Sequence, residues 1–403
     1  MCFFSMRGLF SGVLLVLTLQ ATYARANMDA KAVSSSIAKF SAKFCNELDK
    51  TKNVVASPLS AEMVLGLITL GTEEPAHGEL LTSLGILDDD GIRSSFSLVT
   101  SKLRATQGVT LDVANKVYIK EGDYELNPQL KEDAVKVFDA GFEKIDFNYG
   151  AKAANTINKW VESKTNEKIK DLLSGDSLTS DTRLVFVNAL YFKGTWDKQF
   201  DPSHTIDQLF HVDEEKTTEV PMMYKEDDFV YSESEALGAQ LLQIYYKGEE
   251  ASMLVILPRE VTGLDAVLKK LADGHDLLAE LDNMYRTKVQ VTLPKFKIET
   301  EIDLKELLPK LGITSIFNEL NSGLTKILDN NEPLVVSKAV QKAFIEVNEE
   351  GAEAAAATAM GIAFCSALLV EPPVPSFVAD HPFLVAILIS DTIYFVAAHR
   401  GYE

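Results

Sequence analysis

Six histidines and several acidic runs in this sequence could act as acids, bases or metal ligands. His204 and His211 are seven residues apart, but neither has a further His or Cys at the spacing of a metal site. The runs 88–90 and 349–350 are interpreted as solvated charge rather than as paired catalytic carboxylates. The motifs GxSxG, HExxH and CxxC and a glycine-rich phosphate loop do not occur in the sequence. We therefore expect neither an enzyme nor a metal or cofactor site.

A different chemistry is offered by the stretch EEGAEAAAATAMGIAFCSALL at residues 349–369, which could serve as a substrate. Its alanines favour a helix, but VEPPVPS follows at 370–376, and its prolines fit neither a helix nor a central strand. The next secure strand starts at Pro382. Long loops without secondary structure are usually functional, and an extended, exposed segment is what a protease cleft binds.

The same stretch could also enter a sheet as a strand if Gly351 acts as a hinge. Side chains of a strand alternate between its two faces. One face would carry Ala352, Ala354, Ala356, Thr358 and Met360, and the other Glu353, Ala355, Ala357 and Ala359. The first face is small and uncharged, so it could be buried between two existing strands without the cost of burying unpaired charge.

The composition sets the broad class of protein. The 403 residues are 46% hydrophobic and 24% charged, which suffices for a large core. The net charge of −20 argues against a nucleic-acid-binding protein, which needs a basic face. The nearest approach to a basic cluster consists of Lys102, Arg104, Lys116 and Lys120. We interpret it as solvated surface and do not expect a glycosaminoglycan site there.

The N-terminus has the pattern of a secretory signal peptide over residues 1–26. Arg7 precedes an apolar core at 8–19, and either Thr22-Tyr23-Ala24 or Ala24-Arg25-Ala26 provides the small-residue cleavage site. No later stretch is long enough to cross a bilayer. We therefore expect a secreted, extracellular chain of residues 27–403. Cys2 would leave with the signal, and Cys45 and Cys365 are predicted to be free thiols, the former buried.

Hydrophobic periodicity predicts helices early and strands late in the chain. The predicted helices occupy 32–48, a segment that begins at Ser57 and Pro58, 153–173 and 304–311. The predicted strands occupy 109–119, 184–194, 240–248, 251–258, 289–303, 334–350, 382–389 and 393–401. This pattern is typical of an α+β protein with mostly antiparallel sheets and no separable domains.

Several motifs in order resemble the serpin family over essentially the whole mature chain. EEGAEAAAATA is similar to the family's hinge, and FVNALYFKGTWDKQFDPSHT (186–205) to its most specific internal motif. Further similar stretches are NVVASPLS (53–60), INKWVESKTNEKIKDLL (157–173), ASMLVILP (251–258), LPKFKIE (293–299) and FVADHPFLVAI (377–387). The details resemble secreted arthropod members.

This resemblance implies a single serpin domain over 27–403, with about nine helices, three mostly antiparallel sheets and an exposed reactive loop at about 349–376. A target protease would attack the loop and form an acyl-enzyme. The cut loop would then insert into the main sheet and release stored strain. About fourteen residues at roughly 3.3 Å each would carry the tethered protease about 46 Å, to the opposite pole.

The resemblance also implies positions for the loop. Its hinge residues are Glu350, Gly351, Ala352, Glu353, Ala354, Ala355, Ala356, Ala357 and Thr358. Counting from Gly351 places the reactive bond at Cys365–Ser366, next to Phe364, whereas counting back from Phe377 and Pro382 places it nearer Leu368–Leu369. We prefer the first count because the length of the inserted strand constrains that side. No Arg or Lys lies between Gly351 and Pro382, so elastase-, chymotrypsin- or cysteine-protease-like targets fit better than trypsin-like ones.

Control of sheet opening is expected from Ser57, Asn188, Trp196 and Gln341, which match family positions. Gln341 stands where many members have histidine, and Ala352 where threonine or serine is frequent. The leading interpretation is a monomeric inhibitor that forms a covalent complex with an extracellular protease. The alternative is a non-inhibitory serpin that serves as a carrier or storage protein, although the hinge lacks the bulky or charged inward residues that would favour it.

Overall fold

The computed structural model describes residues 30–330, 332–351 and 373–401. Within these residues there are nine α-helices and two β-sheets, which confirms the α+β class. The first helix covers residues 30–46. The others are α2 (Pro58–Thr69), α3 (Ala76–Leu84), α4 (Asp89–Ala105), α5 (Pro128–Lys136), α6 (Gly150–Lys164), α7 (Leu264–Ala272), α8 (Leu277–Asp282) and α9 (Leu304–Leu307). No helix in the described part of the chain is long and apolar enough to span a membrane.

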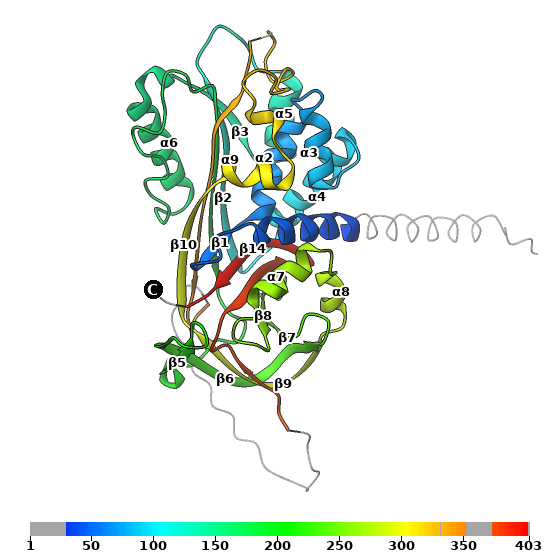
Figure 1. The fold of residues 1–403 in the computed structure, drawn as a ribbon, viewed down its shortest axis with the longest axis vertical. Helices are drawn as coiled ribbons and strands as arrows, with labels where there is room; N and C mark the ends of the chain where they lie inside the picture. The colour runs from blue at the N-terminus through cyan, green and yellow to red at the C-terminus, as the bar shows by residue number, and fades with distance from the viewer. Residues whose placement is uncertain (1–29, 331, 352–372, 402–403) are drawn as a thin grey trace, which may run out of the picture.

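A mixed five-stranded sheet forms the long axis of the molecule (Figure 1). Its order is β10 (Phe296–Asp303), β11 (Val336–Val347), β4 (Leu184–Gly194), β2 (Val109–Lys120) and β3 (Gly141–Ile145). The central pair β11–β4 is parallel, whereas the flanking pairs β10–β11 and β2–β4 are antiparallel. Every residue of β4 except Lys193 is buried, as its continuous apolar run predicts.

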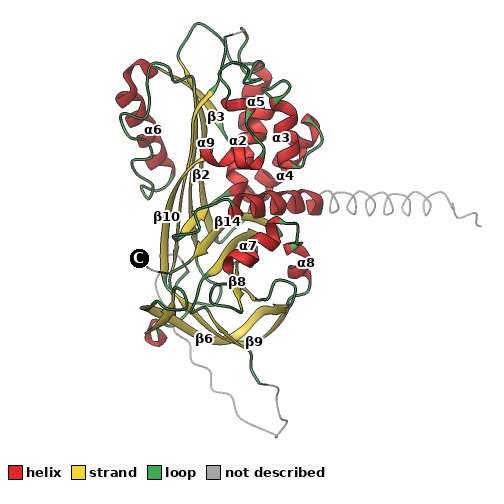
Figure 2. Cartoon of the chain, in the orientation of Figure 1, coloured by secondary structure: helices red, strands yellow, loops and turns green. Residues whose placement is uncertain are grey.

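The second sheet has nine strands and curves around the other half of the molecule (Figure 2). Its order is β1 (Val54–Ala56), β14 (Thr392–His399), β13 (Phe383–Ile389), β8 (Ala251–Pro258), β7 (Ala239–Tyr245), β6 (Thr217–Ser234), β9 (Tyr285–Pro294) and β12 (Ser376–Val378), with β5 (Ile206–His211) also on β6. The long strand β6 pairs with β7 through its last residues and with β9 and β5 through the rest. The second and third sheets that the resemblance implies are therefore continuous through β6.

Two hydrophobic cores lie on opposite faces of the five-stranded sheet. The larger core joins α2 and its neighbouring helices to both sheets. The smaller core lies under α6, which stands alone on the other face (Figure 1). It includes Ile157 and Val161 of α6, Val185 and Val187 of β4, and Phe344 of β11. Helix α2 begins as predicted, with Ser57 as its N-cap and Pro58 in its first turn.

Two predicted elements differ from the structure. The helix predicted over 153–173 ends at Lys164, because Asn166 and Glu167 adopt positive φ angles of 48° and 57° and turn the chain. Ile169 and Leu172 nevertheless stay buried in the smaller core, which explains why the apolar pattern continues. The strand predicted over 289–303 is two strands in different sheets, which separate at Lys295.

Candidate functional site

The chain leaves β11 through a tight turn at 348–351, where the predicted hinge begins. Gly351 N donates to Asn348 O at 3.2 Å, and Glu350 N donates to Asn348 Oδ1 at 3.0 Å. Gly351 has a φ of 104°, and a Cβ at this position would overlap Gly194 O and lie 2.6 Å from Trp196 N. Only glycine fits this turn, because the backbone is left-handed and neighbouring backbone atoms press against it.

The turn is fastened to the segment that follows β4. Trp196 N donates to Glu350 O at 3.0 Å, and Phe200 N donates to Glu349 O at 2.9 Å. The Trp196 indole also donates through Nε1 to Asn348 O at 2.9 Å. Its fully buried ring stacks on Tyr246, with centroids 4.5 Å apart and planes 10° apart. Trp196 therefore fixes the end of β11 against the second sheet.

An ion pair with a buried carboxylate adds to this attachment. Glu349 is 7% exposed, and its carboxylate lies 2.8 Å from Lys295 Nζ and accepts a hydrogen bond of 2.8 Å from Thr205 Oγ1. Burial alone would raise the pKa of Glu349, but the hydrogen bonds from Lys295 and Thr205 and the positive charge of Lys295 outweigh it and lower that pKa. The interpretation of Glu349 as solvated charge is therefore wrong. No local pattern indicates this pair, because the partners of Glu349 are at least 54 residues away in the sequence.

A second polar group lies in the middle of the five-stranded sheet. Asn115 of β2, Asn188 of β4 and Gln341 of β11 are directly opposite one another in adjacent strands and form what we call the amide ladder. Gln341 Nε2 donates to Asn188 Oδ1 at 2.6 Å, and Asn188 Nδ2 donates to Asn115 Oδ1. All three residues are 3% exposed or less. Such a buried network is stable only while its groups remain paired.

Residues at the start of helix α2 form hydrogen bonds with all three members of the amide ladder. Ser57 N donates to Gln341 Oε1 at 2.9 Å, and Gln341 Nε2 donates to Ser57 O at 2.8 Å. Asn188 Nδ2 also donates to Ser60 Oγ at 2.5 Å, and Ser60 Oγ donates to Asn115 Oδ1 at 3.0 Å. Separating β11 from β4 would break the hydrogen bond between Gln341 and Asn188.

The structure brings together three of the four residues predicted to control the sheet, Ser57, Asn188 and Gln341. Trp196 instead belongs to the attachment of the hinge turn. Ser60 and Asn115 were missed, because their contacts follow from the packing of α2 against β2 and β4 rather than from a local sequence pattern. Ala352–Thr358 and the candidate bond residues Phe364, Cys365, Ser366, Leu368 and Leu369 lie outside the described residues.

Other predicted features can be located directly. Cys45 is a buried free thiol, as predicted. No metal-binding cluster of His, Cys, Asp or Glu occurs in the described ranges. The basic residues of the possible cluster are split between α4 and β2, and Arg104 pairs with Asp139 and Lys116 with Glu143.

Comparisons with known proteins give one consistent result. Residues 35–400 match the family model described as "Serpin (serine protease inhibitor)". Antichymotrypsin-2 of Bombyx mori is 44% identical over 86% of this chain and 92% of its own, and antitrypsin of the same insect is 43% identical over 88% and 91%. The crystal structure of Serpin48 from Tenebrio molitor superposes with a TM-score of 0.82 at 33% identity, covering 93% of this chain and 99% of that one.

Proposed function

Because the chain belongs to the serpin family, whose members are named as protease inhibitors rather than enzymes, we propose that it is a secreted suicide inhibitor of a protease with apolar specificity. The protease cleaves the loop near Cys365–Ser366 and remains bound as an acyl-enzyme while the loop inserts. The predicted signal peptide over residues 1–26 supports secretion. The pairing of Arg104 and Lys116 with acidic residues supports a mechanism without a glycosaminoglycan.

The observation that carries this proposal is the parallel pairing of β11 with β4 at the centre of the five-stranded sheet, between two antiparallel pairs. A strand that turns back at Gly351 runs antiparallel to β11, and hence also antiparallel to β4. Insertion between them replaces one parallel pairing with two antiparallel ones, which are slightly more stable for each residue. The isolated bridges Thr195–Gly351 and Asn348–Gly351 already start both pairings.

Extending these two bridges gives the register that we propose for the inserted strand. Seven residues beyond Gly351, Thr358 falls opposite Asn188, which is seven residues before Thr195. The same step places Thr358 opposite Gln341, seven residues before Asn348. In the proposed register, Thr358 therefore lies between Asn188 and Gln341, the two amides that insertion separates. Thr358 is also the only hydroxyl residue between Gly351 and Met360.

Thr358 supports insertion chemically because its hydroxyl can donate one hydrogen bond and accept others. It can replace the bond between Gln341 and Asn188 that insertion breaks, so that the amide ladder keeps its partners. The neighbouring alanines fit the same space without burying charge. The register assigns residues 352–362 to the length of β4 and leaves Cys365 three residues beyond Leu184.

The class of target follows from the loop rather than from the scaffold. Bombyx mori antichymotrypsin-2 and antitrypsin are almost equally similar to this chain, yet their names specify different proteases. The absence of Arg and Lys between Gly351 and Pro382 favours elastase-, chymotrypsin- or cysteine-protease-like targets.

The test is incubation of the purified protein with elastase-, chymotrypsin-, subtilisin- and cathepsin-type proteases, followed by denaturing electrophoresis and mass spectrometry. We expect an adduct that survives denaturation and a released peptide that begins at Ser366. Rapid cleavage of the loop by these proteases without any adduct would instead support a carrier or storage protein.

A further inference from the structure

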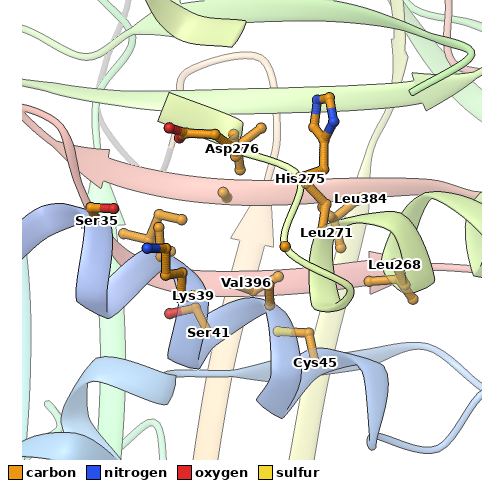
Figure 3. A pocket seen from close by; sticks show the side chains of 16 residues that line it. Ser35, Lys39, Ser41, Cys45, Leu268, Leu271, His275, Asp276, Leu384 and Val396 are labelled. Atoms are coloured by element: carbon orange, nitrogen blue, oxygen red, sulfur yellow. The ribbon is translucent and has the colours of Figure 1, made fainter. Parts of the chain in front are cut away.

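Two cavities in the described part of the chain differ greatly in size. The one between the first helix, α7 and strands β13 and β14 has a volume of about 40 Å³, enough for only a few water molecules (Figure 3). The other has a volume of about 510 Å³ and lies where β4 and β11 begin, at the end of the five-stranded sheet away from the hinge. Protein pockets that bind ligands generally measure about 300–1,000 Å³, so the second cavity can hold a large side chain.

The larger cavity continues the line between the two central strands. Leu184 and Val336 are the first paired residues of β4 and β11, and both are fully buried. Two residues before each of them, Thr182 and Leu334 line the cavity and are also buried. A strand inserted between β4 and β11 would therefore run into this cavity when it passes the end of the sheet.

The register proposed above decides which loop residue reaches the cavity. Extending the bridge between Thr195 and Gly351 places residue 362 opposite Leu184 and residue 364 opposite Thr182. Because Leu184 pairs with Val336, residue 364 also falls opposite Leu334 on the other side. Residue 364 is a phenylalanine, and it is the only aromatic residue between Gly351 and Phe377.

The two faces of the inserted strand would differ in the size of their side chains. Leu184 and Phe186 of β4 belong to the larger core, whereas Val185 and Val187 belong to the smaller core under α6. Residues directly opposite one another share a face, so even-numbered loop residues would face the larger core and odd-numbered ones α6. The even-numbered residues are Ala352, Ala354, Ala356, Thr358, Met360, Ile362 and Phe364, and the odd-numbered ones are Glu353, Ala355, Ala357, Ala359, Gly361, Ala363 and Cys365. Side chains therefore grow towards the cavity on the first face only.

The walls of the cavity are already fixed in the intact protein. Arg183 N donates to Ser337 Oγ at 2.9 Å, and Lys305 Nζ donates to Ser337 O at 3.3 Å. The hydroxyl of Thr182 accepts a hydrogen bond of 3.0 Å from Thr179 N. The cavity therefore needs no rearrangement of these groups to accept a side chain.

We propose that this cavity, which we call the far-pole pocket, binds the side chain of Phe364 once the cleaved loop has inserted. The inference rests on the insertion proposed above and identifies the site that holds the end of the inserted strand. Phe317, Leu334 and Val336 supply apolar wall, and removal of the ring from water drives its binding. The acyl-enzyme is attached at the next residue, Cys365. Phe364 is thus a positioning residue that fixes the attachment point at the far pole.

A disulfide between residues 182 and 364 tests the position of Phe364. Thr182→Cys and Phe364→Cys are combined with Cys365→Ser, and the protein is nicked beyond residue 365 and oxidised with copper phenanthroline. Directly opposite residues of antiparallel strands have Cα atoms about 4.5–5.5 Å apart, which a disulfide can span. Mass spectrometry should find the linked peptides in the nicked protein and not in the intact one. The matched control replaces Phe364→Cys with Ala363→Cys, which faces α6 and should link several-fold less.

This test separates the pocket from insertion itself. A nicked protein that melts at a higher temperature than the intact one, but links residue 364 no better than residue 363, would overturn the pocket and leave the proposed function standing. A nicked protein that melts no higher than the intact one would refute the proposed function, and the pocket with it.

A change in the scaffold tests the effect of the pocket on trapping without altering the loop that the protease recognises. Thr179 lines the pocket from an exposed position, so Thr179→Trp should fill it with a ring. The nicked form should then melt several degrees lower, and the ratio of adduct to cleaved protein should fall several-fold, whereas the intact form should melt as before. The matched control is Ser180→Trp, a neighbouring exposed position outside the pocket. Equal ratios for the two variants would contradict the role of the pocket.

Discussion

Glu349 Oε2 and Lys295 Nζ lie 2.8 Å apart and link the last residues before the hinge to the junction between β9 and β10. Thr205 Oγ1 donates to the same carboxylate, so three distant segments meet at Glu349. The carboxylate side chain is only 10% exposed, whereas that of Lys295 is 37% exposed. The pair therefore holds the hinge turn in place as long as Glu349 is ionised.

Glu349→Gln should destabilise the intact protein by about 2 kcal/mol at neutral pH, because a charge-assisted bond is lost in a mostly buried place. The folded-state pKa of Glu349 is lowered, so the stabilisation is fully present above the ordinary carboxyl pKa and is lost as pH falls through the lowered value. Urea unfolding from pH 7 to pH 3 should show the two proteins converging at the acid end. A difference that stays constant across this range would contradict the role of the ion pair.

Gly351→Ala should destabilise the hinge turn, because the methyl group would overlap Gly194 O and the left-handed backbone disfavours a side chain. We expect a loss of about 1–3 kcal/mol, measured as a lower urea midpoint of the intact protein. The matched control is Gly141→Ala in β3, where an added Cβ meets nothing within 4 Å. If both variants unfold at the same urea midpoint, the left-handed backbone and the close approach of Gly194 O do not restrict residue 351 to glycine.

Gln341 allows a test of the amide ladder by pH. Gln341→Leu should cost about 2–4 kcal/mol, since Asn188 Oδ1 and the backbone of Ser57 lose partners in a buried place. Gln341→His should be more stable than the leucine variant at pH 8. It should lose stability as pH falls below about 6.5, because an unfolded histidine takes up a proton that the buried one resists. Urea midpoints from pH 8 to pH 5 measure this, and a Gln341→His protein with no acid-side loss would contradict burial of the ladder.

Much of the fold could be predicted from the sequence because strand patterns are local. The run at 184–194 is a continuous apolar strand with one amide, and the strand follows from that pattern, whereas the role of Asn188 was implied by the resemblance to the family. Strands β5 and β6 were missed because one face of each is exposed and their acidic residues obscure the alternation. The break at Lys295 was also missed, since β9 and β10 form one alternating run and only their pairing with different strands separates them.

The candidate site was less predictable because its contacts depend on tertiary structure. Asn115 became recognisable only once β2 lay in register with β4. Glu349 is adjacent to a second glutamate in the sequence, which is typical of solvated charge, but folding places Lys295 and Thr205 against it. Sequence patterns identify which residues are polar or small, whereas strand register decides which of them meet.

Thr358→Val tests the register of the inserted strand. The change is nearly isosteric and removes only the hydroxyl that should meet Asn188 and Gln341 after insertion. The cleaved form should therefore be destabilised by about 1–3 kcal/mol, whereas the midpoint of the intact form should hardly change. Thr358→Ser keeps the hydroxyl and is the control. Thermal melting of intact and nicked proteins checks both points, and intact and nicked forms that melt at the same temperature would refute insertion itself.

Cys365→Arg tests where the reactive bond lies. Trypsin-like proteases bind Arg through an aspartate in their specificity pocket, and the loop between Gly351 and Pro382 has no Arg or Lys of its own. In the proposed register, Cys365 lies three residues beyond the end of β4 at Leu184, and Leu368 lies six residues beyond it. A protease attached at residue 365 would therefore be held close to the far pole. A protease attached at residue 368 would be linked to the inserted strand by three more residues and would be held less closely. We expect Cys365→Arg to form a denaturation-resistant adduct with trypsin and Leu368→Arg to be cleaved mainly as a substrate. Denaturing electrophoresis measures the ratio of adduct to cleaved protein, and the opposite ranking of the two variants would place the bond at Leu368–Leu369.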